Sequence, residues 1–385
     1  METLAVTGTI ALTTDGTGNA TVVNATGLNL AASTVGGTLS ATATTGNIIQ
    51  SGTLIITGIT TLVTSANDAT ITLDNTSNAF TGALAITTND ASGTDADATI
   101  DGGTTALVIA ASTIDGDLTL TSGNASGITD SGTVTVGGNL AATTDANAGV
   151  INMANLAVTG TVGLTTDGTG NAIVVNASGL NLAASTVGGT LGATATTGNV
   201  IQSGDLTITC PCTFVTGADG SDIILDSSGN AFAAAVTMKA DDGSEAFGNI
   251  AFVDSAAIKL HSSASADGDL YINAGTDGAV GGNLGVTATT GNITQGAAIA
   301  VTGTSSFTTN ASNGTVTLSE ASNALTGAVS LGTTGPSGNA IVVSASGLDL
   351  AASTVGGTLS ATATTGDIAN SGNLAITGAA TFVTG

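Results

Sequence analysis

The sequence predicts an all-β fold, a right-handed parallel β-helix (β-solenoid) with three short strands in each coil of roughly 25 residues. Three observations support this prediction. A long string of residues is repeated almost unchanged, short apolar segments recur at a regular spacing, and Gly and Asn mark the turns between them. No window sustains the i, i+3, i+4 and i+7 apolar spacing of an amphipathic helix, so we expect no helices.

The repeat is long and divides again. The string LAASTVGGTLSATATTGNIIQSG starts at residue 30, and near copies start at residues 182 and 350. A diverged copy starts at residue 106 and a weaker one at residue 259. A chain that copies its own framework is selected for shape or length. We expect one continuous solenoid over residues 1–385, with repeat units at approximately 4–79, 80–155, 156–231, 232–324 and 325–385.

The apolar segments fall in groups of three. Successive groups begin at Leu4-Ala5-Val6, Leu28-Asn29-Leu30 and Leu54-Ile55-Ile56, which lie 24 and then 26 residues apart. In segments such as Leu118-Thr119-Leu120 and Val134-Thr135-Val136, apolar residues alternate with Thr. Because side chains alternate across a strand, Leu, Val and Ile should point into the coil and Thr outward. The chain should hold roughly 15 such coils.

Gly and Asn mark the predicted turns. Thr45-Gly46-Asn47, Thr197-Gly198-Asn199 and Thr290-Gly291-Asn292 each stand directly before an Ile or a Val. Gly accepts left-handed torsions and Asn tolerates them. Where identical turns stack at ~4.8 Å, the Asn amides should also hydrogen-bond up and down a ladder. The right-handed preference of parallel connections and the irregular coil length give the predicted hand.

Composition excludes several classes of function. The formal net charge is −25, with 27 acidic residues against two Lys, so binding to nucleic acid or to an anionic membrane surface is unfavourable. No run of 18 apolar residues occurs, and we expect no direct membrane insertion. Apolar residues make up 42% of the chain and charged residues 8%, which favours a packed core over disorder.

Both ends of the chain stand inside repeat text, at Met1 and at Gly385. We therefore expect a segment of a longer chain whose ends have no caps. Stacked strand layers with unpaired edges are a template for further strands. The first predicted partner is another copy of this chain, stacked head to tail.

Two segments carry a resemblance to a known family. GTLSATATTGNIIQSGTLIITG, at 37–58, and ATITLDNTSNAFTGALAI, at 69–86, resemble the repeat region of filamentous-haemagglutinin-type exoproteins and giant bacterial surface adhesins. The resemblance covers essentially the whole chain. It implies a rigid exported stalk at the bacterial cell surface, with recognition placed in other segments.

Residues able to carry catalysis are few. The single His261 has Ser neighbours, but adjacency alone does not make a catalytic triad, and we favour a solvated turn histidine. Asp241, Asp242 and Glu245 cluster, yet the chain has no Arg to meet an acidic polysaccharide, so lyase chemistry is not expected. Composition leaves hydrolysis by two carboxylates open. We predict no enzymatic activity and assign no catalytic, cofactor-binding or metal-binding residue.

Calcium is the one cofactor that the sequence leaves open. DGTGN at 15–19 and 167–171, and DGDL at 115 and 267, contain Asp, but the tandem nonapeptide of calcium-binding solenoids does not occur. Because scattered Asp residues in turns are usually capping residues, we predict no cofactor.

Cys210-Pro211-Cys212 replaces Gly58-Ile59-Thr60 of the first copy at a predicted turn. Two Cys residues at this spacing are near the limit for bridging in an extended chain, and two ligands do not complete a zinc site. We favour ordinary thiols at a turn, with an intermolecular disulfide as the alternative.

The segment from Phe232 to Tyr271 breaks the repeat. It holds both Lys, the only His, the only Tyr and three of the seven Phe. Alternation should turn Lys259 and Tyr271 outward. We favour drift or an inserted loop over an interaction surface.

Outward Thr pairs such as Thr42-Ala43-Thr44 raise the alternative of ice binding. They do not recur at a fixed spacing on one face of the predicted coil, so this alternative is a minor one.

Together these observations predict a structural or adhesive extracellular segment that forms a rigid surface stalk or a self-stacking filament at the bacterial cell surface. Host or cell-surface glycans are the further partners we expect. A calcium-dependent surface-layer protein and a polysaccharide-active β-helix enzyme are the alternatives.

Overall fold

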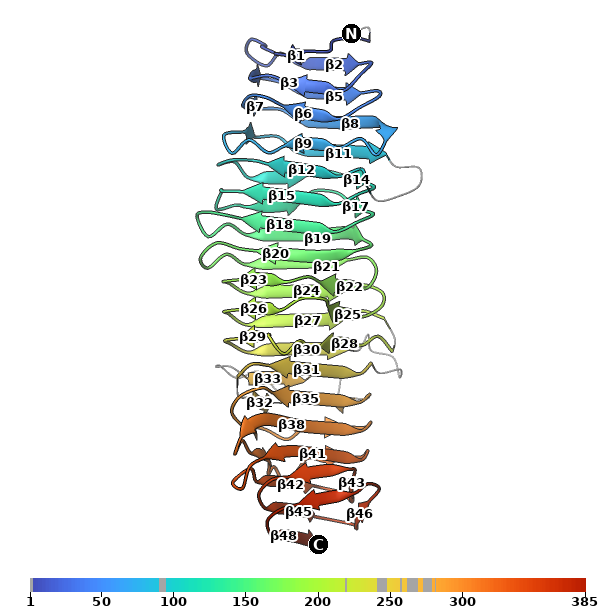
Figure 1. Ribbon diagram of the computed structural model, residues 1–385, viewed down its shortest axis with the longest axis vertical. Coiled ribbons are helices and arrows are strands. Elements are labelled where there is room, and N and C mark those ends of the chain that lie inside the picture. The colour runs from blue at the N-terminus through green and yellow to red at the C-terminus, as the bar shows by residue number, and fades with distance from the viewer. Residues whose placement is uncertain are drawn as a thin grey trace. The chain divides into compact units, whose positions relative to one another are not determined.

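The computed structural model describes residues 3–89, 95–218, 220–240, 248–256, 258–261, 269–272, 279–280 and 282–385. The described residues form strands and turns without helix, and parallel strands stack coil on coil as a β-solenoid (Figure 1). The residues that the structure describes make about 16 turns with a spacing of about 21 residues. The chain divides into two compact units, Met1–Thr190 and Leu191–Gly385. The predicted all-β solenoid is confirmed.

The strands of the first unit are β1 Thr9–Ile10, β2 Ala20–Asn24, β3 Leu28–Leu30, β4 Ser33–Val35, β5 Leu39–Ala43, β6 Ile48–Gln50, β7 Leu54–Ile56, β8 Thr60–Asn67, β9 Ile71–Leu73, β10 Ala79–Phe80, β11 Leu84–Asn89, β12 Ala98–Asp101, β13 Leu107–Ile109, β14 Ser112–Ile114, β15 Leu118–Ser122, β16 Ile128–Asp130, β17 Val134–Val136, β18 Leu140–Thr144, β19 Ile151–Val158, β20 Thr161–Thr165, β21 Ala172–Asn176, β22 Leu180–Leu182 and β23 Ser185–Val187.

The strands of the second unit are β24 Leu191–Ala195, β25 Val200–Gln202, β26 Leu206–Ile208, β27 Cys212–Thr216, β28 Ile223–Leu225, β29 Ala231–Phe232, β30 Val236–Ala240, β31 Ile250–Asp254, β32 Ile258–His261, β33 Asp269–Ile272, β34 Ala279–Val280, β35 Leu284–Ala288, β36 Ile293–Gln295, β37 Ala300–Val301, β38 Ser305–Ser312, β39 Val316–Leu318, β40 Ala324–Leu325, β41 Val329–Thr334, β42 Ala340–Ser344, β43 Leu348–Leu350, β44 Ser353–Val355, β45 Leu359–Ala363, β46 Ile368–Asn370, β47 Leu374–Ile376 and β48 Ala380–Thr384.

A coil holds three short strands, as predicted. In the first unit β3, β4 and β5 make one coil, and β6, β7 and β8 make the next. Each strand pairs in parallel with its equivalent, so that Leu28 lies beside Ile48 and Leu39 beside Thr60. Each strand therefore gives its backbone hydrogen bonds to the coils on either side of it.

The coil is shorter than the predicted length of roughly 25 residues. We expected Ile48 in the same coil as Leu28, but Ile48 lies one coil further on and pairs with Leu28 directly. The strand that the prediction missed is β4, because its inward Ser33 interrupts the apolar alternation and is nevertheless buried. Longer coils also occur, as where Ile71 pairs with Ala98, 27 residues further on. The hand of the coil stays a prediction.

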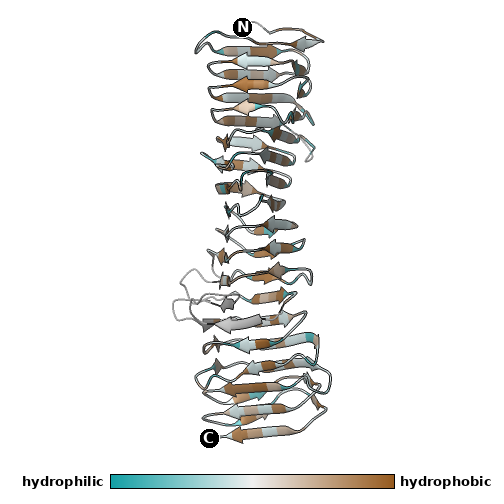
Figure 2. Ribbon diagram, turned by 90° about the vertical axis from the view of Figure 1, so that its left-hand side faces the viewer, coloured by the Kyte–Doolittle hydropathy of each residue, from teal (hydrophilic) through white to brown (hydrophobic). Residues whose placement is uncertain are grey.

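The interior of the coils is apolar, as the alternation predicted. In β15, Leu118 and Leu120 are buried while Thr119 between them is exposed. In Figure 2 the hydrophobic colour lies along the strands of each unit. Burying one Leu, Ile or Val side chain contributes about 1.5–3 kcal/mol, so the stacked interior is the main source of stability.

Some predicted features lie outside the described residues. These are Met1, Asp241, Asp242 and Glu245, together with the side chains of Lys259, His261 and Tyr271.

We expect Phe80→Ala to destabilise the first unit by about 3–5 kcal/mol, because the fully buried ring would leave a cavity. The matched control is Ile55→Ala, on the neighbouring strand β7, where the side chain is 46% exposed. Urea denaturation followed by circular dichroism gives the midpoints, and amide hydrogen exchange shows where protection is lost. Equal effects of the two variants would contradict the assignment of inward and outward positions.

Candidate functional site

Inside the first unit, two amide side chains from neighbouring coils, Gln50 and Asn78, form a pair of reciprocal hydrogen bonds. The Gln50 amide nitrogen donates to Asn78 Oδ1 at 2.9 Å, and Asn78 Nδ2 donates to Gln50 Oε1 at 2.9 Å. Asn78 Oδ1 also accepts the Leu54 backbone N–H at 3.0 Å, and its Nδ2 donates to the Asp101 carbonyl at 3.1 Å. One fully buried amide therefore joins three successive coils.

The same arrangement occurs twice in the second unit. Gln202 pairs with Asn230 through two 2.9 Å hydrogen bonds, and Asn230 Oδ1 accepts the Leu206 backbone N–H. Gln295 pairs with Asn323 in the same way. In each case 28 residues separate the Gln from the Asn. Sequence analysis missed these pairs, although the recurring Gln and Asn at this spacing were the available signal.

The Asn residues of the predicted turns bridge neighbouring coils on the outside. Asn47 Oδ1 accepts the Thr70 backbone N–H at 3.0 Å, and Asn292 Oδ1 accepts that of Thr315 at 2.9 Å. These two Asn side chains bond from coil to coil, but their partner is the backbone N–H of the next coil rather than another amide of the predicted ladder.

One outward face of the first unit carries a column of Thr. Thr121, Thr143, Thr165 and Thr186 lie side by side on successive strands, 22, 22 and 21 residues apart. The statement that outward Thr does not recur at a fixed spacing on one face is wrong here, because the true coil length places these residues in one column. Their hydroxyl and methyl groups make this face neutral and polar.

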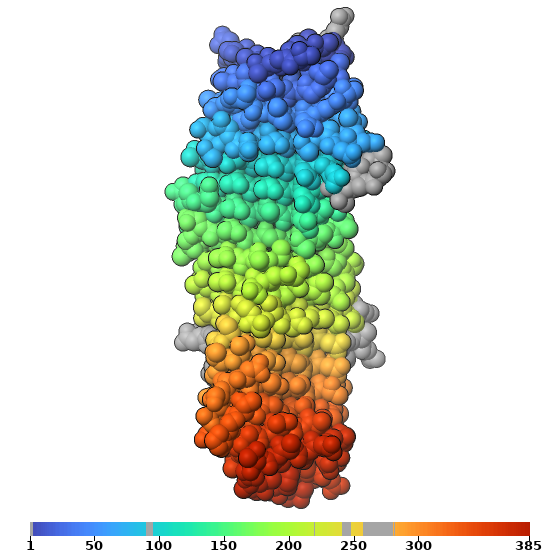
Figure 3. Space-filling view, viewed as in Figure 1, coloured from blue at the N-terminus to red at the C-terminus, as the bar shows by residue number. Residues whose placement is uncertain are grey.

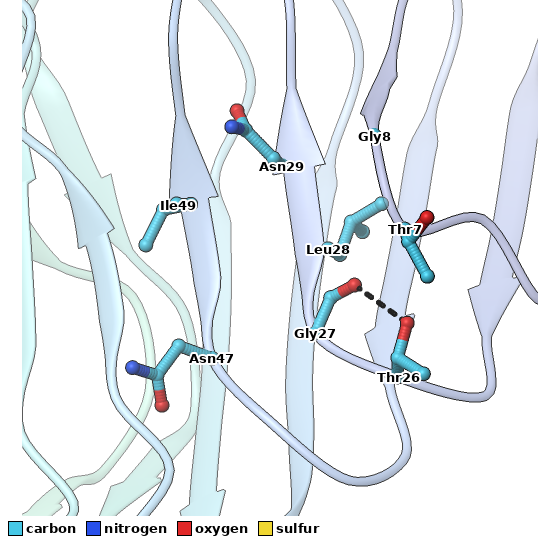
Figure 4. A pocket seen from close by; sticks show the side chains of 8 residues that line it. All are labelled: Thr7, Gly8, Thr26, Gly27, Leu28, Asn29, Asn47 and Ile49. Carbon is cyan, nitrogen blue, oxygen red and sulfur yellow. Dashed lines mark hydrogen bonds between the residues drawn. The ribbon is translucent and has the colours of Figure 1, made fainter.

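A shallow groove of about 390 Å³ lies on the first coils of the first unit (Figure 4). Its lining residues are Thr7, Gly8, Thr26, Gly27, Leu28, Asn29, Asn47 and Ile49. Asn29 Oδ1 is a buried acceptor without a hydrogen-bond partner, and the equivalent oxygens of Asn181 and Asp349 share this feature. The lining carries no ionisable side chain, so the groove can offer hydrogen bonds and apolar contact but no acid–base chemistry.

A second hollow of about 320 Å³ lies on the last coil of the second unit. It is lined by Leu350, Ile368, Ala369, Asn370, Leu374, Phe382 and Thr384. Phe382 pairs with Ala361, which is fully buried, so Phe382 occupies an inward position. It is nevertheless 49% exposed, because β48 pairs on one side only among the described strands. On the face shown in Figure 3, each unit presents rows of side chains from stacked coils.

Neither Cys residue is in a disulfide, and the two lie in different surroundings. Cys212 was predicted at a turn, but it begins β27, faces the interior and is 2% exposed. It takes the inward position that Thr60 holds in the first unit, where the Thr hydroxyl lacks a partner. Burial, and then the nearby Asp254 carboxylate, raise the pKa of the Cys212 thiol. Cys212 is therefore a neutral core side chain, which excludes it from an intermolecular disulfide in the folded protein.

Asp254 is a buried carboxyl that sequence analysis did not single out. It ends β31, is 4% exposed and accepts the Phe232 backbone N–H at 3.2 Å. Burial raises its pKa, while hydrogen bonds from the backbone N–H groups of Phe232, Ser255 and Ala256 oppose that rise. In the first unit the hydroxyl of Thr105 accepts the hydrogen bond of the corresponding Phe80 backbone N–H.

No group of three or more His, Cys, Asp or Glu that could hold a metal ion is found in the described parts of the chain. Nor do those parts include a helix long and apolar enough to cross a membrane.

The model of one protein family matches most of the chain. The family is described as repeats of unknown function (DUF5649), and its model matches residues 17–87, 169–239, 264–332 and 337–385. The chain belongs to this family. No curated protein and no solved structure matches it. The DUF5649 repeats and the solenoid agree with the predicted repeat protein, while the narrower resemblance to haemagglutinin-type adhesins stays a prediction.

We expect Asn78→Ala to destabilise the first unit strongly. It leaves the Leu54 N–H buried without a partner, at about 1–3 kcal/mol, and it removes the two hydrogen bonds to Gln50 and the one to the Asp101 carbonyl. The control is Thr76→Ala, an exposed turn position two residues away. Hydrogen exchange of the coils around Asn78 and the urea midpoint measure the effect. A variant as stable as the control would contradict the bridging role.

We expect the stability of the second unit to depend on pH through Asp254. The pKa of Asp254 in the folded protein is raised above the ordinary 3.8. Its contribution to the free energy of unfolding is therefore complete below the pKa of the unfolded chain. That contribution is lost as the pH rises through the pKa of the folded protein. The urea midpoint of the wild type, relative to that of Asp254→Asn, should therefore rise between about pH 7 and about pH 4. Asp226→Asn, at an exposed position, is the control. A constant or falling difference would contradict the assignment.

Proposed function

We propose that the chain is a structural spacer of a bacterial surface stalk or filament, whose stacked coils set length and rigidity. The observation that supports this role is the recurrence of the Gln–Asn pair at 50 and 78, 202 and 230, and 295 and 323. These side chains hydrogen-bond to one another and to neighbouring coils, so the repeated Gln–Asn pair stabilises the stacking of the coils.

Outward positions next to these pairs differ between the copies. The central outward residue is Ile55 in β7 and Thr207 in β26, while Ala300 occupies the equivalent place in β37. In all three copies the flanking inward residues are buried and apolar. A surface that bound one ligand in each repeat would require the same outward side chains in each copy, whereas a spacer requires only the same interior.

The composition of the protein surface supports an extracellular location. The surface is rich in neutral Thr, as in the column from Thr121 to Thr186, and the whole chain holds two Lys and no Arg. Proteases specific for basic residues therefore have few sites, and the ladder of backbone hydrogen bonds resists local opening. Host or cell-surface glycans remain the proposed contacts of the stalk as a whole.

We expect antibodies raised against the folded chain to label intact cells of the source bacterium, because the proposed spacer lies outside the cell envelope. Immunogold electron microscopy and flow cytometry measure the label. Brief treatment of intact cells with a broad-specificity protease should remove it while leaving a cytoplasmic marker untouched. Labelling that appears only after the cells are permeabilised would contradict the surface role.

A further inference from the structure

We propose that an array of outward Thr side chains on the first unit binds the surface of ice. The strands that carry it are β12, β15, β18, β20 and β23, which pair one after another in a single sheet (Figure 1). The Thr array consists of Thr99, Thr119, Thr121, Thr143, Thr165 and Thr186. The inference goes beyond the proposed structural role and does not depend on it.

The Thr array has two parallel rows. In the first row Thr99 pairs with Thr119, and the row continues through Ala141 and Gly163. In the second row each Thr pairs with the next, in the order Thr121, Thr143, Thr165 and Thr186. Neighbours within a row lie ~4.8 Å apart, and the rows, two residues apart along each strand, are separated by roughly 6.6 Å. The array is therefore a regular lattice of small neutral side chains.

The hydroxyl groups of the Thr array are available to a ligand. None of the six hydrogen-bonds to another part of the chain that the structure describes. The inward Thr that follows two of them behaves differently, because the Thr144 hydroxyl donates to the Gly149 carbonyl at 2.8 Å and the Thr166 hydroxyl donates to that of Gly170 at 2.9 Å. Inward Thr hydroxyls thus stabilise the turns, whereas the hydroxyls of the array face outward.

The groups of the Thr array are held in place before a ligand arrives. Thr is β-branched, which restricts rotation about its first side-chain torsion. The backbone of each strand is also fixed by hydrogen bonds to the coils on both sides. Binding a rigid surface through this array therefore costs little conformational entropy.

The spacing of the Thr array favours a ligand that itself repeats at regular intervals. The surface of ice presents water oxygens in a lattice whose repeats are close to the two spacings of the array. Each Thr offers this lattice a hydroxyl for hydrogen bonding and a methyl group for close contact. A protein partner is a poorer fit, because the array has none of the aromatic or Arg anchors on which protein interfaces depend. A crystalline polysaccharide also repeats, but the array has no aromatic ring to stack on a sugar.

The first test measures how much of the purified 385-residue chain is retained in a slowly growing front of ice. We expect the wild type to be retained, and Thr143→Lys to be retained at least about fivefold less, because a long charged side chain within the second row keeps the face from the lattice. The control is Asn152→Lys, which adds the same charge at an exposed outward position of β19 and should behave like the wild type. Circular dichroism and the urea midpoint check that both variants are folded.

The second test completes the first row of the array. Ala141 is exposed, and a Cβ added at Gly163 would lie no closer than 3.6 Å to a neighbouring atom, so both positions have room for an outward Thr. We expect the double variant Ala141→Thr, Gly163→Thr to be retained in ice about twofold more than the wild type. A role of these residues in the fold alone would not produce this gain.

Three results would overturn the proposal. The first is a wild type retained in ice no better than serum albumin, and the second is retention that Thr143→Lys leaves unchanged. The third is an equal loss in Thr143→Lys and Asn152→Lys, which would place the contact elsewhere. Adsorption to microcrystalline cellulose without retention in ice would identify a polysaccharide surface as the ligand instead. Surface exposure is measured on cells and ice retention on purified chain, so the proposed function and this inference can fail separately.

Discussion

The buried amide of Asn78 and its counterparts Asn230 and Asn323 constrain how each coil meets its neighbours. In a parallel solenoid each strand must lie beside its equivalent in the previous coil, although the length of the coil varies. The turns also bring backbone N–H and C=O groups into an apolar interior. An unpaired buried N–H or C=O is costly, so a residue that satisfies several such groups at once determines where the turn can lie. Asn78 accepts from the coil that contains Leu54 and donates to the coil that contains Asp101, while Gln50 completes its hydrogen bonding.

The solenoid relies on hydrogen bonds rather than on pairs of charges. With two Lys in the whole chain, the acidic residues have few cations to pair with, and several instead accept backbone N–H groups of a neighbouring coil. Asp117 illustrates this, because its carboxylate accepts the Asn139 N–H at 2.6 Å. Asp254 is a buried example, in which backbone N–H groups offset only part of the lost solvation and the pKa of the carboxyl group stays raised.

Repetition has two physical consequences for a solenoid. Each coil contacts mainly its neighbours, so a coil that is stable in one place is stable wherever equivalent neighbours flank it. A pair of coils that fits once, as the coils before and after Gly138 do, also fits wherever the same two surfaces recur in the chain. Copying a framework thus extends a structure without a new interface, which explains why near-identical text recurs in a chain of this family.

The sequence alone predicted the all-β class, three strands per coil, the inward and outward sides of strands such as Leu118–Ser122, and the bridging Asn of the turns. These follow from local rules, because side-chain alternation and turn torsions are set within a few residues. Only the tertiary structure decided the coil length, the inward place of Cys212, the column of Thr121 to Thr186 and the pairing of Gln50 with Asn78. Each depends on which strand lies beside which. That choice is made by backbone pairing between residues that are mostly about 20 or more apart in the sequence. A short strand with a buried Ser, such as β4, gives no apolar pattern from which the pairing could be predicted.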